Sequence, residues 1–210
     1  MDYEKELSQM IKIIFADCNI ENLSSYEKRE RIFSYLTDTI SYDFELLEKI
    51  REKELDKRNV TLIRNPKQEL LDVVFYKQGI CNGISQCYKL LLEEVGIHSY
   101  CVICDDGTDV KHQLNLVYDK ENDVYSFDDV TSVIVKRGTK DQFFDYDMES
   151  ANKLSQFNRV IFEGRKHFVL PETYVNYILG RDKGISPNID YLPENIASVK
   201  DVIQPKRHKS

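Results

Sequence analysis

The stretch QGICNGISQCYKLLLEEVGI, residues 78–97, contains a short lead-in, a cysteine and an amphipathic helix. Its apolar residues recur at helical spacing and predict a helix over about 81–94, which Gly96 ends. Cys81 therefore falls in the first turn, where unpaired backbone N–H groups and the helix dipole stabilise a thiolate. Gly79 and Gly83 on either side allow another backbone or a substrate to come close. A cysteine alone is more often a small buried residue, so other residues must decide its role.

Helical periodicity also fills the sequence before this segment. Ser24 and Glu27 have the spacing of a capping box, and Asn65 followed by Pro66 is typical of a helix start. The highly charged third segment fits a helix that faces solvent. The predicted helices cover residues 3–16, about 24–40, 45–58 and 66–78.

Beyond Gly96 the apolar period changes from helical to alternating. Three strands are predicted over 98–104, 113–118 and 124–129, with Asp-, Gly- and Asn-rich turns at 105–109 and 119–123. A fourth strand can follow over 132–135. This order predicts an α+β fold in which N-terminal helices and a central helix bearing Cys81 pack on an antiparallel sheet. We expect one domain over 1–180, a short helix opening at 170–172, and an irregular tail over 181–210.

Composition and charge restrict the kind of protein. The 210 residues are 41% hydrophobic and 31% charged, and the net charge of −7 argues against a general nucleic-acid binder. No apolar stretch approaches the roughly 20 residues that span a bilayer, and the acidic N-terminus does not resemble a secretory signal. The five cysteines are irregularly spaced, so we expect a cytoplasmic protein without a disulfide framework. Cys101 and Cys104 have C-x-x-C spacing but no second ligand pair, so no metal site is predicted.

His112 and an acid on the following strand complete a candidate catalytic set with Cys81. A thiol nucleophile needs an imidazole to hold the thiolate and later protonate the leaving amine, and a carboxylate orients that imidazole. His112 opens one predicted strand, and Asp128 and Asp129 lie on opposite faces at the end of the next. Asp129 shares its face with Phe127. If that face lies toward the helix of Cys81, Asp129 is the partner of His112 and Asp128 is solvated.

Three segments in order resemble motifs of transglutaminase-like domains, which are papain-like thiol enzymes. The segments are Gly79-x-Cys81-x-Gly83, His112-x-x-Asn115-Leu116-Val117 and Tyr125-x-x-x-Asp129-x-Thr131. Upstream, residues 32–43, which include Ile40-Ser41-Tyr42-Asp43, resemble a helix-to-strand segment of bacterial members. The resemblance covers about residues 30–135. It implies a papain-like fold with Cys81 as nucleophile, His112 as base and Asp129 as orienting acid.

The implied reaction is acyl transfer from an amide of a peptide or protein through a Cys81 thioester, with no cofactor. Water as acceptor gives a peptidase or deamidase, and a lysine amine gives cross-linking; the sequence does not choose, nor does it predict an oligomeric state. Two alternatives stay open. One is a catalytically inert protein-binding scaffold of the same fold, and the other is an acyltransferase of the arylamine acetyltransferase type.

The chain also departs from related patterns. Leu114, Tyr125 and Ser132 stand where the family often has tryptophan, so specificity stays open. The papain motif Q-G-x-C-G-S-C-W does not fit this sequence, because Ile84 stands at the position of its catalytic cysteine. Backbone N–H groups near Cys81 are candidate donors to an oxyanion, with Gln78 as a candidate helper.

Overall fold

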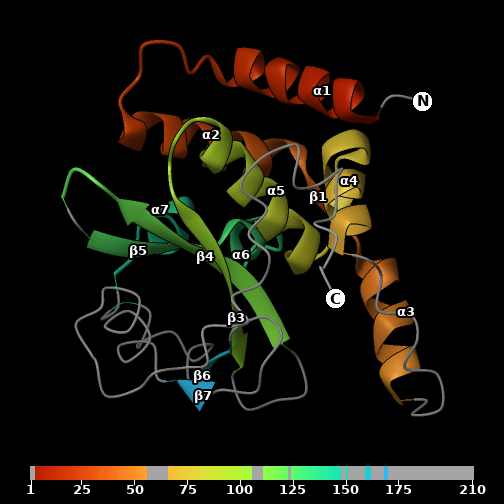
Figure 1. The fold of residues 1–210 in the computed structure, drawn as a ribbon. Coiled ribbons are helices and arrows are strands. Elements are labelled where there is room, and N and C mark those ends of the chain that lie inside the picture. The colour runs from red at the N-terminus through yellow and green to blue at the C-terminus, as the bar shows by residue number, and fades with distance from the viewer. Residues whose placement is uncertain are drawn as a thin grey trace, which may run out of the picture.

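The fold combines helices with a small antiparallel sheet, which confirms the α+β class (Figure 1). The computed structural model describes residues 3–55, 66–105, 111–122, 124–147, 150, 159–161 and 168–169. The predicted helix at 170–172, the tail over 181–210 and most of the turn at 105–109 lie outside these residues. None of the described helices is long and apolar enough to cross a membrane.

Among the described residues, four helices precede the cysteine and follow the predicted pattern. They are α1 (Tyr3–Cys18), α2 (Ser25–Thr39), α3 (Phe44–Leu55) and α4 (Pro66–Tyr76). The capping box at the start of α2 is present: the Glu27 N–H donates to the Ser24 hydroxyl, and the Ser24 N–H donates to the Glu27 carboxylate. Between these helices, β1 (Ser41–Tyr42) and β2 (Gln78–Gly79) form a two-stranded parallel pair.

The larger sheet has the strand order β5-β4-β3-β6-β7. β3 (Ser99–Asp105), β4 (Lys111–Asp119) and β5 (Val124–Asp128) form the predicted antiparallel meander. β6 (Arg159–Ile161) extends it beside β3, and β7 (Phe168–Val169) pairs with β6. After β5 come the short helices α6 (Val130–Ile134) and α7 (Lys140–Phe143).

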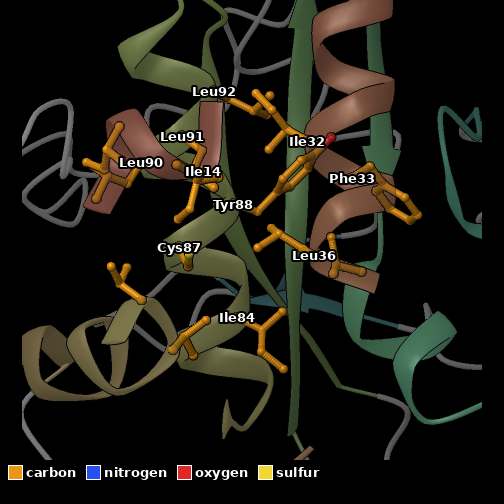
Figure 2. Close-up of a cluster of buried hydrophobic side chains, with 14 of the residues drawn as sticks. Ile14, Ile32, Phe33, Leu36, Ile84, Cys87, Tyr88, Leu90, Leu91 and Leu92 are labelled. Carbon is orange, nitrogen blue, oxygen red and sulfur yellow. The ribbon is translucent and has the colours of Figure 1, made fainter. Parts of the chain in front are cut away.

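Helix α5 (Cys81–Glu94) lies at the centre of the fold and contacts α2, α4, β3 and β4. Figure 2 shows the side chains of Cys87, Tyr88 and Leu91 within the apolar cluster that α5 shares with α2. The Tyr88 ring packs edge-on against Phe33, with 5.9 Å between ring centroids. Every α5 residue from Gly83 to Leu92 is buried, so the helix is anchored along most of its length and only its two ends approach the surface.

Two sequence predictions about β5 and its surroundings are wrong. Residues 132–135 do not form a fourth strand, because most of them belong to α6. Asp128 is not solvated: it has no exposed surface. An ion pair with Arg29 of α2 compensates its charge in this buried position. The strand face that carries Asp128 lies toward α5, as its hydrogen bond from Tyr88 shows, so the Phe127 face lies away from the helix of Cys81.

Candidate active site

Cys81 is the first residue of α5 and is half-buried. The chain reaches it from β2 through Ile80, whose extended backbone forms the N-cap without any side-chain hydrogen bond. The N–H groups of the first turn therefore receive no carboxylate or hydroxyl from the cap residue. This arrangement places the sulfur at the positive end of the helix dipole.

The first turn of α5 is fixed against α4 by close packing. A Cβ atom on Gly83 would lie 2.6 Å from the Glu69 backbone oxygen, so only glycine allows α4 to pass so near. Next to it, the Asn82 amide donates to the Glu69 carboxylate at 2.6 Å, and the Gln86 amide donates to the Asn82 side-chain oxygen at 2.8 Å. The backbone that carries Cys81 is consequently fixed by close packing and hydrogen bonds.

His112 lies near the start of β4, and its ring lies close to both other members of the candidate set. Its Nε2 is 2.8 Å from Oδ2 of Asp129, and the nearby Cys81 side chain also favours the charged form of the ring and raises its pKa. Since Nε2 is bonded to Asp129, Nδ1 is the nitrogen left for the sulfur. Burial lowers the pKa of His112, but the charge and hydrogen bond of Asp129 outweigh it and raise the pKa from 6.5 to about 10. The imidazole is therefore held in its charged form at neutral pH.

Asp129 has no exposed surface and is the N-cap of α6. Its Oδ1 accepts from the Ser132 N–H at 2.9 Å, and its Oδ2 accepts from the Ser132 hydroxyl at 2.6 Å as well as from His112. Burial raises the pKa of Asp129, but the imidazolium and the Ser132 donors outweigh it and lower the pKa below its ordinary value. The Asp129 N–H donates to the Phe143 carbonyl at 2.8 Å, which fixes the backbone as well.

The structure thus brings together the three residues that the sequence analysis singled out. However, Asp129 does not reach His112 because the Phe127 face of the strand lies toward α5. Asp129 meets His112 because the chain leaves β5 at Asp128 and turns into a helix, with Asp129 at its cap. The Phe127 face of the strand packs instead against Tyr146, with 5.6 Å between ring centroids.

Tyr42 is a site residue that sequence reasoning missed as such. It lies on β1 opposite Gly79, and its hydroxyl lies close to the Cys81 backbone, which acts to lower its pKa. Burial, with the nearby charge of Cys81, raises the pKa of Tyr42 to about 12, so the phenol keeps its proton. The only sequence signal was the Ile40-Ser41-Tyr42-Asp43 segment noted above. Gln78, which the sequence analysis named as a candidate helper for the oxyanion, is exposed on β2.

The remaining described cysteines are more deeply buried than Cys81. Cys18, Cys87 and Cys101 are buried, and burial raises the pKa of Cys18 to about 11 and that of Cys87 to about 12. The side chain of Cys104 lies outside the described part, so the C-x-x-C pair stays untested. In the described part of the chain, no group of three or more His, Cys, Asp or Glu side chains could hold a metal ion.

A pocket of about 400 Å³ lies between the start of α2 and the turn from β4 to β5. None of the three candidate catalytic side chains lines it, so it is separate from the thiol. Its lining includes Tyr26, Arg29, Ile97, His98, Tyr118 and Lys120.

No protein-family model and no curated protein matches this chain. A solved structure described as "Crystal structure of a TGase" is similar, with a TM-score of 0.46 and 18% identity. The similarity covers 61% of this chain and 31% of that chain. The function of the protein therefore has to be argued from its own residues.

Proposed function

We propose that this protein is a thiol enzyme of the papain-like, transglutaminase-like type that acts on amide bonds of peptides or proteins. The observation that supports it most is the convergence of Cys81, His112 and Asp129, in which His112 binds Asp129 at 2.8 Å and the nearby Cys81 side chain favours the charged imidazole. In the proposed roles, Cys81 is the nucleophile, His112 the acid and base, and Asp129 the orienting acid.

The first half of the proposed reaction forms a thioester. The Cys81 thiolate attacks the amide carbonyl carbon, and the carbonyl electron pair moves onto oxygen as an oxyanion. When the oxyanion collapses, the carbon–nitrogen bond breaks and the His112 imidazolium gives its proton to the leaving amine. The raised pKa of His112 supports this role, since the proton is already present when the amine departs.

The second half releases the acyl group. Neutral His112 accepts a proton from the incoming water or amine, which attacks the thioester and restores the Cys81 thiolate. Asp129 keeps the ring oriented through both steps and stabilises its charged form, as a buried hydrogen-bonded carboxylate does in related chemistry. Either acceptor fits these three groups, so hydrolysis and transamidation are both versions of this proposal.

Tyr42 supports the oxyanion step. The Tyr42 hydroxyl lies close to the Cys81 backbone, and its proton can rotate toward an oxygen that binds next to the sulfur. A donor directed at the developing negative charge contributes to an oxyanion hole, and loss of one such donor typically costs about 10²–10³ in rate.

The test is to trap the acyl-enzyme. The protein is incubated with a peptide library and quenched in acid, and the adduct mass on the peptide containing Cys81 is read by mass spectrometry. We expect adducts with the wild type and none with Cys81→Ala, while Cys18→Ala, which removes a buried thiol elsewhere, keeps them. If circular dichroism shows Cys81→Ala folded and its amide turnover is unchanged, the proposal is wrong. If the folded wild type forms no adduct and turns over no amide, the scaffold alternative replaces the proposal.

A further inference from the structure

Gln113 directly follows His112 in β4, and only 4% of its surface is exposed. Because side chains alternate along a strand, Gln113 points to the opposite face from His112. Its amide donates to the Ser85 hydroxyl of α5 at 2.7 Å. The backbone that carries the candidate base is therefore attached to the helix of the candidate nucleophile, one residue away from the imidazole.

Ser85 connects this strand with the first turn of α5. It lies one helical turn after Cys81 and is 2% exposed. Its hydroxyl donates to the Asn82 carbonyl at 3.1 Å. Since the same hydroxyl accepts from Gln113, one oxygen joins β4 to the residue that follows Cys81.

Asn115 forms a second link between the same two elements. It lies two residues after Gln113 on the same face of the strand, and its amide donates to the Ser85 backbone carbonyl at 3.0 Å. Ser99 of β3 accepts a further hydrogen bond from this amide at 3.2 Å. Two side chains of β4 thus bind the hydroxyl and the carbonyl of one residue, which fixes the strand against α5 in distance and in register.

The polar character of this contact indicates a role beyond packing. A buried amide or hydroxyl gives up its hydration, and apolar side chains would hold a strand against a helix without that cost. A hydrogen bond adds direction, since it weakens steeply away from its preferred length and angle. Reacting groups have to be held within about 0.5 Å of their productive places, and a directional contact next to them provides this precision.

We propose that Gln113 is a positioning residue. Through the Ser85 hydroxyl it holds the strand of His112 so that the imidazole stays beside the thiol. Asp129 fixes the ring through its Nε2 atom, whereas Gln113 fixes the backbone that carries the ring. This inference rests on the proposed function, because it concerns the same thiol and imidazole.

The experiment measures how the rate of Cys81 alkylation by iodoacetamide depends on pH, in the wild type and in variants. In this reaction the Cys81 sulfur forms a bond to carbon and iodide leaves, and peptide mapping measures the modification of each cysteine. Cys18 and Cys87 are buried, so they stay unmodified in folded protein and the same map shows whether a variant is folded. The first variant is Gln113→Met, which replaces the amide by an apolar group of similar length.

We expect Gln113→Met to lower the rate at about pH 6.5 by about two- to tenfold, the factor that one net hydrogen bond contributes to an equilibrium. At about pH 10, where an ordinary thiol is ionised in any case, the rate should equal that of the wild type. Ser85→Ala should show the same loss. The double variant Gln113→Met/Ser85→Ala should lose no more than either single variant, because all three remove one contact.

The matched control is Ser99→Ala, which removes a buried hydroxyl that binds Asn115 but not the first turn of α5. It should keep the wild-type pH profile, and an equal loss at about pH 6.5 in Ser99→Ala and Gln113→Met would contradict the proposed role.

A wild-type profile in folded Gln113→Met would overturn this inference alone. If Cys18 and Cys87 also react in Gln113→Met, that variant is unfolded, and the profile of Ser85→Ala decides by the same criterion. If the wild type and His112→Ala share one profile, the proposed function fails and this inference fails with it.

Discussion

At the scale of single residues, the Ser132 hydroxyl and the His112 ring share one oxygen of Asp129. The two donors lie 2.6 Å and 2.8 Å from Oδ2. A carboxylate oxygen that accepts from two donors is held in one orientation. The Ser132 hydroxyl also takes up part of the negative charge of this oxygen, which weakens its interaction with His112. Ser132 therefore influences both the position of His112 and how strongly its proton is held.

Ser132→Ala tests this positioning role. Loss of a hydrogen bond to a charged group should cost about 1.5–3 kcal/mol of unfolding free energy, measured by urea denaturation. The freed Asp129 oxygen should bind the imidazolium more strongly, so the pKa of His112 followed by NMR should rise further. Ser132→Thr, which keeps the hydroxyl, should restore the wild-type titration.

The matched control is Ser126→Ala on β5. This hydroxyl donates to Asp145 at 2.6 Å and accepts from Arg29, so its loss should cost stability without moving the His112 titration. If the His112 titration is the same in Ser132→Ala as in the wild type, Ser132 is only a structural residue.

At the scale of elements, a buried ionic network joins α2 to the end of β5. The Arg29 guanidinium donates to both oxygens of Asp128, at 2.7 Å and 2.8 Å, and also to Ser126 and Asp145. Tyr88 of α5 donates to Asp128 at 2.7 Å. Since Asp128 directly precedes Asp129, this network fixes the end of the strand from which the candidate catalytic acid projects.

Arg29→Met should destabilise the protein by about 3–5 kcal/mol, because it leaves the Asp128 carboxylate buried without its counter-ion. Urea denaturation measures the change. Lys140→Met is the control, since it removes a half-exposed ion pair with Glu30 and should cost at most about 1 kcal/mol. An equal, small loss in both variants would mean that the network does not hold β5 in place.

The same elements show what the sequence can and cannot predict. The helices from α1 to α5 were predictable because their signals are local: the Ser24 capping box and the apolar spacing after Cys81 need no knowledge of distant residues. The short helix α6 was not predictable from its β-branched residues, since its start depends on Asp129 acting as a cap. The burial of Asp128 depends on Arg29, 99 residues earlier in the chain, which no local pattern reveals.

The same distinction between local and distant signals applies to the candidate site. Cys81, His112 and Asp129 were accessible from motif order, since the chemistry demands those residue types. Tyr42 was not, because its hydroxyl comes close to the Cys81 backbone only through the pairing of β1 with β2.

At the scale of the whole molecule, helix α5 connects the apolar cluster with the candidate active site at the N-terminal end of the helix. Its buried length packs against α2, α4 and the sheet (Figures 1 and 2), and its first residue, Cys81, is half-buried. β4 brings the imidazole to that end, and the β5–α6 junction brings the carboxylate. The fold therefore explains why three residues spread over 49 positions can act as one unit.

The most direct measurement is the rate of Cys81 alkylation by iodoacetamide as a function of pH, in the wild type and in His112→Ala. An ordinary thiol is only about 1% thiolate at pH 6.5, whereas an imidazolium whose pKa is raised to about 10 keeps its charge beside the sulfur there and loses it only as pH rises through about 10. We predict that at pH 6.5 wild-type Cys81 reacts at least about tenfold faster than Cys81 in His112→Ala. Equal rates in the two proteins, both rising with pH as for an ordinary thiol, would contradict the account.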